Sequence, residues 1–396
     1  MIRQKLKKFS NQKIHVSFFI GSLSIGGTEK QLLNLVNSLD KNKFRIDLFI
    51  LMNEKGELFN ELNSSINVYL PKFKFKSKIK HFLNFIVNLY RVKKSKPDII
   101  HCFLPFAYIV GGLIGLLVNH QNIIMSRRSL NNYQNKFKFI PIKKIESFLH
   151  KKIKIILVNS KAVKKNIIDE GASANKTKII YNGFIKPEES VKESKSNFKK
   201  KLGISNNDFV FLILANLIPY KNHRLIIESV YYLSQIKRNF KVIFLGSGQE
   251  KYKENLKNII KKKKLNRFFI FKNRTKYIKS FLNITDVGIS SSLEEGLSNS
   301  LIEFISFGIP TISTNVGGNS EITNNDNGFL IESNNQAQLT SAMKTLMFDQ
   351  ELLIYKSLKS KEDSKKFSLN EMIKKYSNLY QNILSDNTGN DSFLKD

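Results

Sequence analysis

The sequence contains little cysteine, little proline and few acidic side chains. Its single cysteine, Cys102, excludes an internal disulfide framework and a cysteine-cluster metal site, and is typical of a reducing compartment. With 7 Pro and 19 Gly, the chain is neither collagen-like nor of low complexity. Hydrophobic residues make up 41%, a globular value, so 396 residues predict two or three domains with large cores.

A long uninterrupted hydrophobic run is also lacking. The best candidate, residues 99–118, contains His101 and Pro105 and has only the minimum length for a bilayer span. We therefore expect a strand over 98–104 and a buried, glycine-rich helix over 107–117. No apolar stretch of signal-peptide type precedes the first predicted strand, which predicts a cytoplasmic protein.

What the sequence has in excess is positive charge. It carries 65 Lys and Arg against 32 Asp and Glu, a formal net charge of +33. Up to Ile185 there are 33 basic and 10 acidic residues, so the first half holds most of the excess. Such a surface attracts nucleic acid, anionic lipid or phosphate-bearing substrates; the alternative is a compositional bias toward solvated lysines. We expect this half, including Lys72, Lys74, Lys76, Lys78 and Lys80, to dock on an anionic membrane.

Strands and helices alternate twice along the chain. In the first half, strands are predicted over 14–20, 44–51, 99–103, 123–125 and 155–158, with helices over 28–39 and 78–94 between them. In the second half, strands are predicted over 209–215, 241–245, 268–271, 287–290 and 311–313, with helices over 223–237, 250–263, 278–283 and 299–307. The pattern predicts an α/β protein with two doubly wound, Rossmann-like domains that face a central cleft.

The polar stretch 187–201 is typical of a linker between these domains. We expect a first domain over 1–186 and a second over 187–365. Residues 366–396 are predicted to form a C-terminal helix that crosses back to the first domain, followed by a tail.

Glycine-rich turns follow two of the predicted strands. The first turn is similar to a nucleotide-binding P-loop, but Gly27 stands where that motif needs lysine, which disfavours a P-loop ATPase. Gly246-Ser-Gly248 lacks the third glycine of a dinucleotide fingerprint. A Gly26–Gly27 turn before a helix still offers backbone N–H groups to an anion; a plain tight turn is the alternative.

The most informative local segment runs from Ser290 to Glu303. A predicted strand, a polar turn with Glu295 and Gly296, and a helix that opens near Asn299 place free N–H groups beside carboxylates. These groups can hold a phosphate, and Glu303 can accept hydrogen bonds from a ribose. The alternative is a capping box, in which Ser300 caps the helix and Glu303 is its third residue.

Lys221 follows the first strand of the second domain, where a lysine at the cleft could neutralise a diphosphate. An ordinary solvated lysine is the alternative at this position.

The ordered set of short segments resembles the GT-B glycosyltransferases, specifically the large retaining family four, over about residues 14–385. The resemblance rests on residues 26–35, 96–101, 158–160, 180–183, 217–221, 286–291, 295–303, 308–310, 317–318, 321–322 and 327–328. It implies transfer of a sugar from a nucleoside-diphosphate sugar to an acceptor hydroxyl, with retention of anomeric configuration. A bacterial surface polysaccharide, a capsule or a lipid-linked oligosaccharide is the expected product.

The resemblance also implies roles for single residues. Glu295 is similar to the acid that holds donor-sugar hydroxyls, Glu303 to the ribose ligand, and Lys221 to the lysine that offsets the charge of the leaving diphosphate. The backbone of Gly296, Leu297, Ser298 and Asn299 would meet the phosphates, and Gly26 and Gly27 would meet the phosphates or the acceptor. The family needs no metal, and none is expected here.

Two positions depart from the family pattern. Many relatives carry an arginine five residues before the lysine, where this chain has Asn216; we expect Asn216 to contact the donor with less positive charge at the phosphates. Many also carry a histidine after the fourth strand, where this chain has Arg127 and Arg128. Either arginine could substitute for the histidine or serve an acidic acceptor, and Arg128 is the candidate catalytic residue. His101 is expected to be structural.

Two other classes stay open from the sequence. A nucleic-acid-binding protein would explain the charge and the alternation of aromatic and basic residues over 71–80, but no nucleic-acid module is recognisable. A non-catalytic nucleotide-sugar binder would explain Asn216 and the missing histidine. Donor hydrolysis or transfer separates the binder from the enzyme.

Overall fold

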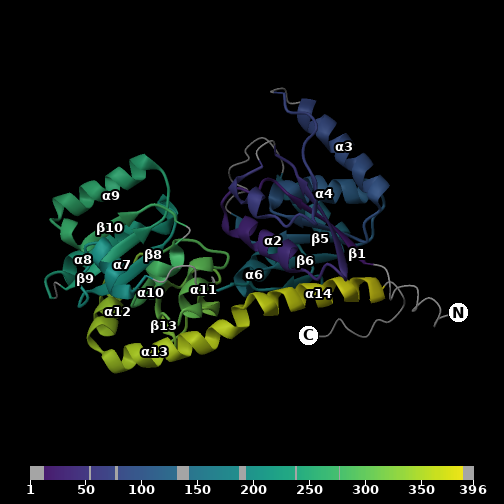
Figure 1. The fold of residues 1–396 in the computed structure, drawn as a ribbon. Coiled ribbons are helices and arrows are strands. Elements are labelled where there is room, and N and C mark those ends of the chain that lie inside the picture. The colour runs from purple at the N-terminus through teal and green to yellow at the C-terminus, as the bar shows by residue number, and fades with distance from the viewer. Residues whose placement is uncertain are drawn as a thin grey trace. The chain divides into compact units, whose positions relative to one another are not determined.

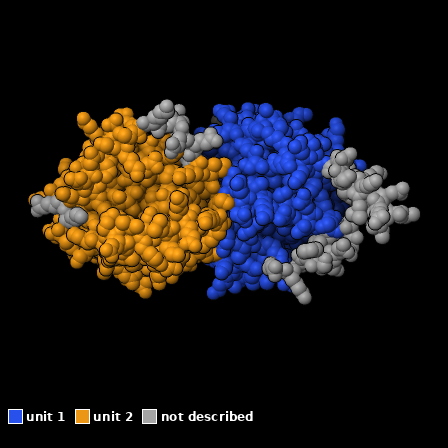
Figure 2. All heavy atoms as spheres, turned by 60° about the horizontal axis from the view of Figure 1, so that its bottom comes forward, with its two compact units in different colours: residues 1–183, 369–396 blue, residues 184–368 orange. Residues whose placement is uncertain are grey.

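The computed structural model describes residues 13–52, 55–75, 79–131, 142–186, 193–236, 239–275 and 277–386. The chain divides into two compact units (Figure 1, Figure 2). Unit 1 comprises residues 1–183 and 369–396, and unit 2 comprises residues 184–368. The chain therefore passes from one unit to the other after Gly183 and again after Ser368, three residues from each boundary that the sequence suggested.

Unit 1 is built on a seven-stranded parallel sheet with the order β3-β2-β1-β4-β5-β6-β7. Its strands are β1 (Ile14–Ile20), β2 (Phe44–Ile50), β3 (Asn67–Tyr69), β4 (Ile99–Phe103), β5 (Ile123–Arg127), β6 (Ile155–Val158) and β7 (Thr177–Ile179). Its helices are α2 (Gly27–Ser38), α3 (Ile79–Ser95), α4 (Pro105–Leu117), α5 (Ile142–Lys152), α6 (Lys161–Asp169), α14 (Leu369–Asp386) and the short η1 (Glu57–Glu61). β1 and β4 are buried on both faces of the sheet, as expected for strands covered by helices on each side.

Unit 2 has a six-stranded parallel sheet with the order β10-β9-β8-β11-β12-β13. Its strands are β8 (Phe209–Leu214), β9 (Phe240–Leu245), β10 (Phe269–Lys272), β11 (Val287–Ser290), β12 (Thr311–Thr314) and β13 (Gly328–Ile331). Its helices are α7 (Lys195–Lys201), α8 (His223–Leu233), α9 (Glu250–Lys262), α10 (Ile278–Asn283), α11 (Asn299–Ser306), α12 (Gln336–Phe348), α13 (Gln350–Asp363) and the short η3 (Pro219–Lys221), η4 (Asn266–Phe268), η5 (Asn319–Glu321) and η6 (Ser364–Phe367). These two sheets confirm the predicted pair of doubly wound domains.

The stretch that the sequence suggested as a linker is partly helical. α7 occupies its C-terminal end, and the Ser194 hydroxyl caps this helix by accepting from the backbone N–H of Asn197 at 3.2 Å. The polar stretch 187–201 thus ends in a helix of unit 2, and residues 187–192 lie outside the described residues. The capping serine explains the difference, because an N-cap starts a helix even where apolar residues are scarce.

Residues 99–118, the best candidate for a membrane span, form strand β4 and helix α4 instead. A Cβ on Gly111 would lie 2.5 Å from Sγ of Cys102, and one on Gly115 would lie 2.6 Å from Cδ1 of Ile123. The helix therefore lies directly on β4 and β5, and only glycine permits this approach. None of the helices in the described ranges combines the length and the apolar character that a bilayer span requires.

Helix α14 completes unit 1 from the far end of the chain (Figure 1). It buries Tyr376 and Tyr380 fully in the core formed by β1, β2, β4 and α2. The Tyr380 hydroxyl lies 2.7 Å from Nδ1 of His101 on β4, and the other ring nitrogen lies 2.8 Å from the Ser126 hydroxyl on β5. Burial, and then the Arg128 guanidinium, hold the pKa of His101 well below its usual range. These contacts give His101 a structural role.

Candidate active site

The order of the unit-2 strands reverses between β8 and β11, so these two strands flank the topological switch point of the sheet. Ligands of such sheets bind outside the carboxyl ends of the strands at the switch point. Lys221 ends the η3 turn that follows β8, and Glu295 lies in the turn that follows β11. Two of the predicted site residues thus occupy the loops where this topology places a ligand.

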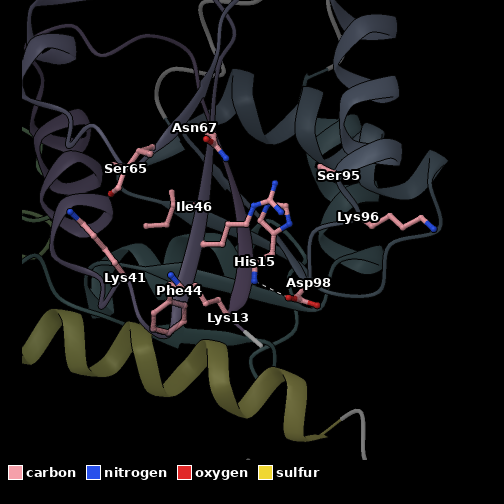
Figure 3. Close-up of a pocket in the computed structure, with 12 residues that line it drawn as sticks. Lys13, His15, Lys41, Phe44, Ile46, Ser65, Asn67, Ser95, Lys96 and Asp98 are labelled. Atoms are coloured by element: carbon pink, nitrogen blue, oxygen red, sulfur yellow. Dashed lines mark hydrogen bonds between the residues drawn. The ribbon is translucent and has the colours of Figure 1, made fainter. Parts of the chain in front are cut away.

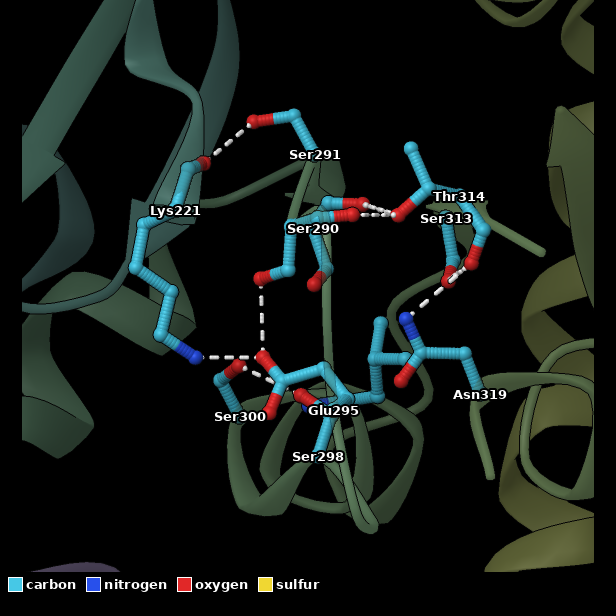
Figure 4. Close-up of polar contacts among 11 residues, drawn as sticks. Lys221, Ser290, Ser291, Glu295, Ser298, Ser300, Ser313, Thr314 and Asn319 are labelled. Atoms are coloured by element: carbon cyan, nitrogen blue, oxygen red, sulfur yellow. Dashed lines mark hydrogen bonds and ion pairs between the residues drawn. The ribbon is translucent and has the colours of Figure 1, made fainter. Parts of the chain in front are cut away.

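The side chains of Lys221 and Glu295 are in direct contact (Figure 4). The Lys221 ammonium donates to Oε1 of Glu295, and the Ser292 hydroxyl donates to the same oxygen at 2.8 Å. The two ionic side chains are 17% and 12% exposed, so a ligand can reach both although most of each side chain is shielded. Both of these contacts use Oε1 of the carboxylate.

A second layer of hydrogen bonds holds these two loops together (Figure 4). The Ser291 hydroxyl donates to the backbone carbonyl of Lys221 at 2.9 Å, and the Thr314 hydroxyl donates to that of Ser292 at 2.6 Å. Nδ2 of Asn319 donates in turn to the carbonyl of Thr314 at 3.1 Å. The loops after β8, β11 and β12 are therefore joined into one framework that fixes the backbone of both charged residues.

Gly317 supplies close packing that the sequence analysis did not connect with the site. Its φ is +54°, and a Cβ there would lie 1.6 Å from the carbonyl oxygen of Glu295. The next residue, Gly318, donates its N–H to the carbonyl of Gly296 at 3.1 Å. The Gly317-Gly318 pair was visible in the sequence, but its pairing with the Glu295 turn depends on tertiary structure.

The start of α11 differs from the capping box that the sequence offered as an alternative. The N-cap is Ser298, whose hydroxyl accepts from the backbone N–H of Leu301 at 3.4 Å. Ser300 is therefore inside the helix, and Glu303 is the fifth helical residue instead of the third. The capping-box interpretation is wrong, because a carboxylate two positions further along cannot reach back to the cap. Glu303 is 8% exposed.

The four residues of the predicted phosphate-binding turn lie in this same segment. Leu297 and Ser298 are buried, whereas Gly296 and Asn299 are half-buried at the start of α11. The turn runs directly from Glu295 into the helix N-terminus, where the first backbone N–H groups and the helix dipole favour an anion.

The loops after β8 and β9 run side by side at the same edge. The backbone N–H of Leu217 donates to the carbonyl of Ser247 at 3.0 Å, and a Cβ on Gly246 would lie 2.0 Å from the carbonyl oxygen of Ala215. Close backbone approach thus accounts for Gly246-Ser-Gly248, which is not part of a dinucleotide fingerprint. Asn216, predicted to contact the donor, is exposed at the carboxyl end of β8.

In unit 1, the predicted glycine turn lies at the carboxyl end of β1, where Gly26 is the N-cap of α2. Oε2 of Glu29 lies only 2.0 Å from the position that a Cβ on Gly26 would take. Burial raises the pKa of Glu29 above its usual value, and its own backbone N–H partly offsets this effect. A carboxylate therefore already occupies the space beside the Gly26–Gly27 turn, which favours a hydroxyl-bearing ligand there over a phosphate.

Arg127 and Arg128, the two candidates for the missing histidine, have different environments. The Arg127 guanidinium is 1% exposed and lies 3.5 Å from Glu146 and 3.0 Å from Glu170. The Arg128 guanidinium donates to Oδ1 of Asn182 and to the Tyr376 hydroxyl. Arg127 is thus a structural residue of the core, because its buried guanidinium is engaged by two carboxylates and is not presented to a ligand.

A separate cavity of about 610 Å³ lies at the opposite edge of the unit-1 sheet (Figure 3). It is lined by residues at the amino ends of β1 to β4, among them Lys13, His15 and Asp98. Nε2 of His15 lies 2.9 Å from Oδ2 of the fully buried Asp47. Burial alone would raise the pKa of Asp47, but hydrogen bonds from His15 and Asn67 hold it below the usual value. This cavity is remote from the carboxyl edge and does not form part of the candidate active site.

The structure defines a two-domain α/β protein whose second sheet has polar and charged loops at its switch point, and comparisons with known proteins indicate its family. Residues 25–185 match the family model "Glycosyltransferase Family 4", and residues 194–363 match "Glycosyl transferases group 1". The chain is 24% identical over 381 residues to the UDP-Gal:alpha-D-GlcNAc-diphosphoundecaprenol alpha-1,3-galactosyltransferase of Escherichia coli, covering 94% of this chain and 98% of that protein. It is 26% identical to the capsular polysaccharide biosynthesis glycosyltransferase CapH of Staphylococcus aureus, over 81% of this chain and 87% of that one.

Among solved structures, Anabaena HepE in complex with UDP is similar with a TM-score of 0.79, at 18% identity, covering 94% of this chain and all of the other. The same protein with UDP-glucose gives a TM-score of 0.78, at 18% identity, over 94% of this chain and 99% of the other. The protein belongs to the group 1 glycosyltransferases of GT-B fold. The resemblance suggested by the sequence is thereby confirmed.

Proposed function

We propose that this glycosyltransferase transfers a sugar from a nucleoside-diphosphate sugar to an acceptor hydroxyl with retention of anomeric configuration. The observation that carries the proposal is the Lys221–Glu295 pair at the switch point, next to the N-terminus of α11. One site then offers a cation and helix N–H groups for a diphosphate, and a carboxylate for sugar hydroxyls.

Each residue has a proposed task in this reaction. The Lys221 ammonium and the N–H groups of residues 296–299 would stabilise the negative charge that grows on the diphosphate as the glycosidic bond breaks. The carboxylate of Glu295 would accept from hydroxyls of the donor sugar, and Glu303 would accept from the ribose. These groups provide the charge compensation that other transferases obtain from a metal, so a metal-independent reaction is proposed.

Unit 1 would bind the acceptor. Glu29 beside the Gly26–Gly27 turn can accept a hydrogen bond from an acceptor hydroxyl, which fits its position better than a phosphate contact. Arg128, held by Asn182 and Tyr376, is the proposed cation of this unit in place of the family histidine.

The names of similar proteins guide the choice of donor and acceptor. The E. coli relative is named for a UDP-galactose donor and a diphosphoundecaprenol acceptor, and the HepE structures contain UDP or UDP-glucose. We propose a hexosyl or N-acetylhexosaminyl donor, a saccharide or lipid-linked acceptor, and a role in bacterial surface polysaccharide synthesis at the cytoplasmic face of the membrane.

A thermal-shift panel of nucleotides and nucleotide sugars tests the donor site. A ligand at a hundred times its dissociation constant adds about 2.7 kcal/mol to the free energy of unfolding. We expect UDP and at least one UDP-sugar to raise the melting temperature, and the double variant Lys221→Ala with Glu303→Gln to show a clearly smaller rise at the same ligand concentration. A panel without any response contradicts the proposal. Binding with neither transfer nor donor hydrolysis identifies the non-catalytic binder, the class that the exposed Asn216 would favour.

A further inference from the structure

Helix α3 of unit 1 buries two asparagines on its inner face and exposes several large apolar side chains, which is unusual for a surface helix. Its buried residues are Asn84, Asn88 and Val92. Oδ1 of Asn84 accepts from the backbone N–H groups of Lys72 and Phe73 at 3.0 Å, and its Nδ2 donates to the carbonyl of Phe73 at 2.9 Å. The asparagine contacts therefore tie the helix to the segment that precedes it.

The opposite face of α3 carries a row of large apolar side chains, which we call the α3 stripe. Its members are Ile79, Phe82, Ile86 and Tyr90, and they are 62%, 65%, 44% and 65% exposed. Their spacing of three, four and four residues places them on one face of the helix. Single exposed apolar residues are ordinary, but four on one helical face mark an interaction surface.

Basic side chains surround the stripe. Residues 71–96 include nine Lys and Arg and no Asp or Glu. Of those that the structure describes, Lys72, Lys74, Lys93, Lys94 and Lys96 are exposed. The surface is therefore apolar along its centre and positive at both ends of the helix.

The apolar stripe and the positive charge around it together indicate which kind of partner binds this surface. A second copy of this chain would bring the same positive segment against itself, which is unfavourable for a protein with a net charge of +33. Nucleic acid would satisfy the lysines but offers little to the aliphatic side chains of Ile79 and Ile86. An anionic lipid surface takes both, because apolar side chains enter the acyl boundary while lysines stay at the headgroups.

We infer that α3 is a membrane-docking helix that lies in the interface of an anionic bilayer with the α3 stripe inserted. The 17-residue helix lies on the membrane and does not span it. This inference extends the proposed function, since a lipid-linked acceptor would be presented at such a surface. Vesicle binding and nucleotide binding are measured separately, so either can fail while the other holds.

Sedimentation with vesicles is the first test. The full chain should bind equimolar phosphatidylcholine–phosphatidylglycerol vesicles, release them as salt is raised, and bind phosphatidylcholine alone far more weakly. Phe82→Ser with Tyr90→Ser should weaken binding by ~10-fold or more, because each removes a large inserted side chain. The matched control is Tyr232→Ser with Leu358→Ser, which removes two similarly exposed residues of unit 2 and should change nothing.

A fluorescence reporter tests the insertion itself. The protein has no tryptophan, so Phe82→Trp introduces a single reporter in the stripe. Its emission should shift to the blue with the anionic vesicles, whereas that of Tyr232→Trp should not. Unchanged Phe82→Trp emission in vesicle-bound protein, equal binding by the double serine variant, or equal binding to neutral vesicles overturns the inference. A dimer in sedimentation equilibrium that the serine variant dissociates would assign the stripe to a second copy instead.

Discussion

Lys221 and Glu295 follow the two strands that flank the switch point of unit 2, and they pair with each other across it. Each charge therefore compensates the other, at the place where a donor would need both. A diphosphate that approaches Lys221 would compete with Glu295 for the ammonium, and a sugar hydroxyl would replace the ammonium at the carboxylate. The pair keeps both side chains positioned without requiring either to be desolvated alone.

The first prediction concerns Lys221. Its positive charge acts on negative charge that grows during bond breaking, so Lys221→Ala should lower kcat more than donor affinity. The loss of one preorganised contact of this kind typically reduces turnover by ~10²–10³-fold. Steady-state kinetics with the donor found in the thermal-shift panel measures the effect.

The control is Lys251→Ala, which removes an exposed lysine from α9 and should leave turnover unchanged. Normal turnover in Lys221→Ala would show that Lys221 only compensates the charge of Glu295.

The second prediction separates the two glutamates. Glu303→Gln keeps the size of the side chain but weakens the acceptor, so nucleoside diphosphate should bind roughly tenfold more weakly. Glu295→Gln should leave that affinity nearly intact and lower transfer instead. Calorimetric titration with UDP measures the affinity of both variants. If Glu303→Gln binds UDP as tightly as the natural chain, Glu303 is a structural residue of α11.

Ser298→Ala provides the matched test of the cap. Removal of an N-cap hydroxyl typically costs about 1 kcal/mol of stability. A lower melting temperature in Ser298→Ala, but not in Ser300→Ala, would verify which serine caps α11.

The sequence predicted most of the fold because its signals are local. The strands Ile99–Phe103, Ile155–Val158 and Val287–Ser290 have the predicted bounds, since each is a short apolar run between polar turns. β3 and β7 escaped prediction because they contain three residues each, too few for a periodic pattern. The start of α11 at Asn299 was predicted, but the capping-box alternative chose Ser300 over the true cap Ser298, because only backbone geometry distinguishes these two serines.

The site was predictable where strand order alone determines it. Lys221 and Glu295 could be placed at strand ends from the sequence, but their direct contact could not. The contribution of Tyr376 and Tyr380 to unit 1 was also hidden, because they lie more than 240 residues after the partners they contact, Arg128 and His101. Residues this far apart in sequence meet only through the tertiary fold.

The third prediction contrasts the two arginines of unit 1. Arg127→Met leaves Glu146 and Glu170 buried without their cation, so the free energy of unfolding should fall by ~3–5 kcal/mol. Arg128→Lys keeps a positive charge and should retain the fold but lower transfer, because lysine cannot donate to Asn182 and Tyr376 in the same fork. Urea unfolding and transfer assays on both variants measure these effects. If Arg127→Met were stable but had reduced transfer activity, Arg127 would be a functional residue and not a structural one.

The fourth prediction concerns His223, the first residue of α8. Its ring packs edge-on against Phe244 with centroids 5.0 Å apart and is fully buried. Burial, and then the charge of Lys221, lower the pKa of His223 to about 4. The folded protein therefore keeps this ring neutral in a range where the unfolded chain, with a histidine pKa of about 6.5, binds a proton.

The sign of the pH effect follows from this difference. Because the unfolded state binds the extra proton, stability is fully present above about pH 6.5 and is lost progressively as pH falls toward about 4. Between about pH 7.5 and about pH 5 the loss from this one residue is about 2 kcal/mol. His223→Phe keeps an aromatic ring but cannot titrate, so it should lose about 2 kcal/mol less than the natural chain over that interval.

Urea unfolding at both pH values measures the difference, with His81→Gln, a change at an exposed histidine, as the control. If the free energy of unfolding fell equally on acidification in His223→Phe and in the natural chain, His223 would not be buried as a neutral ring.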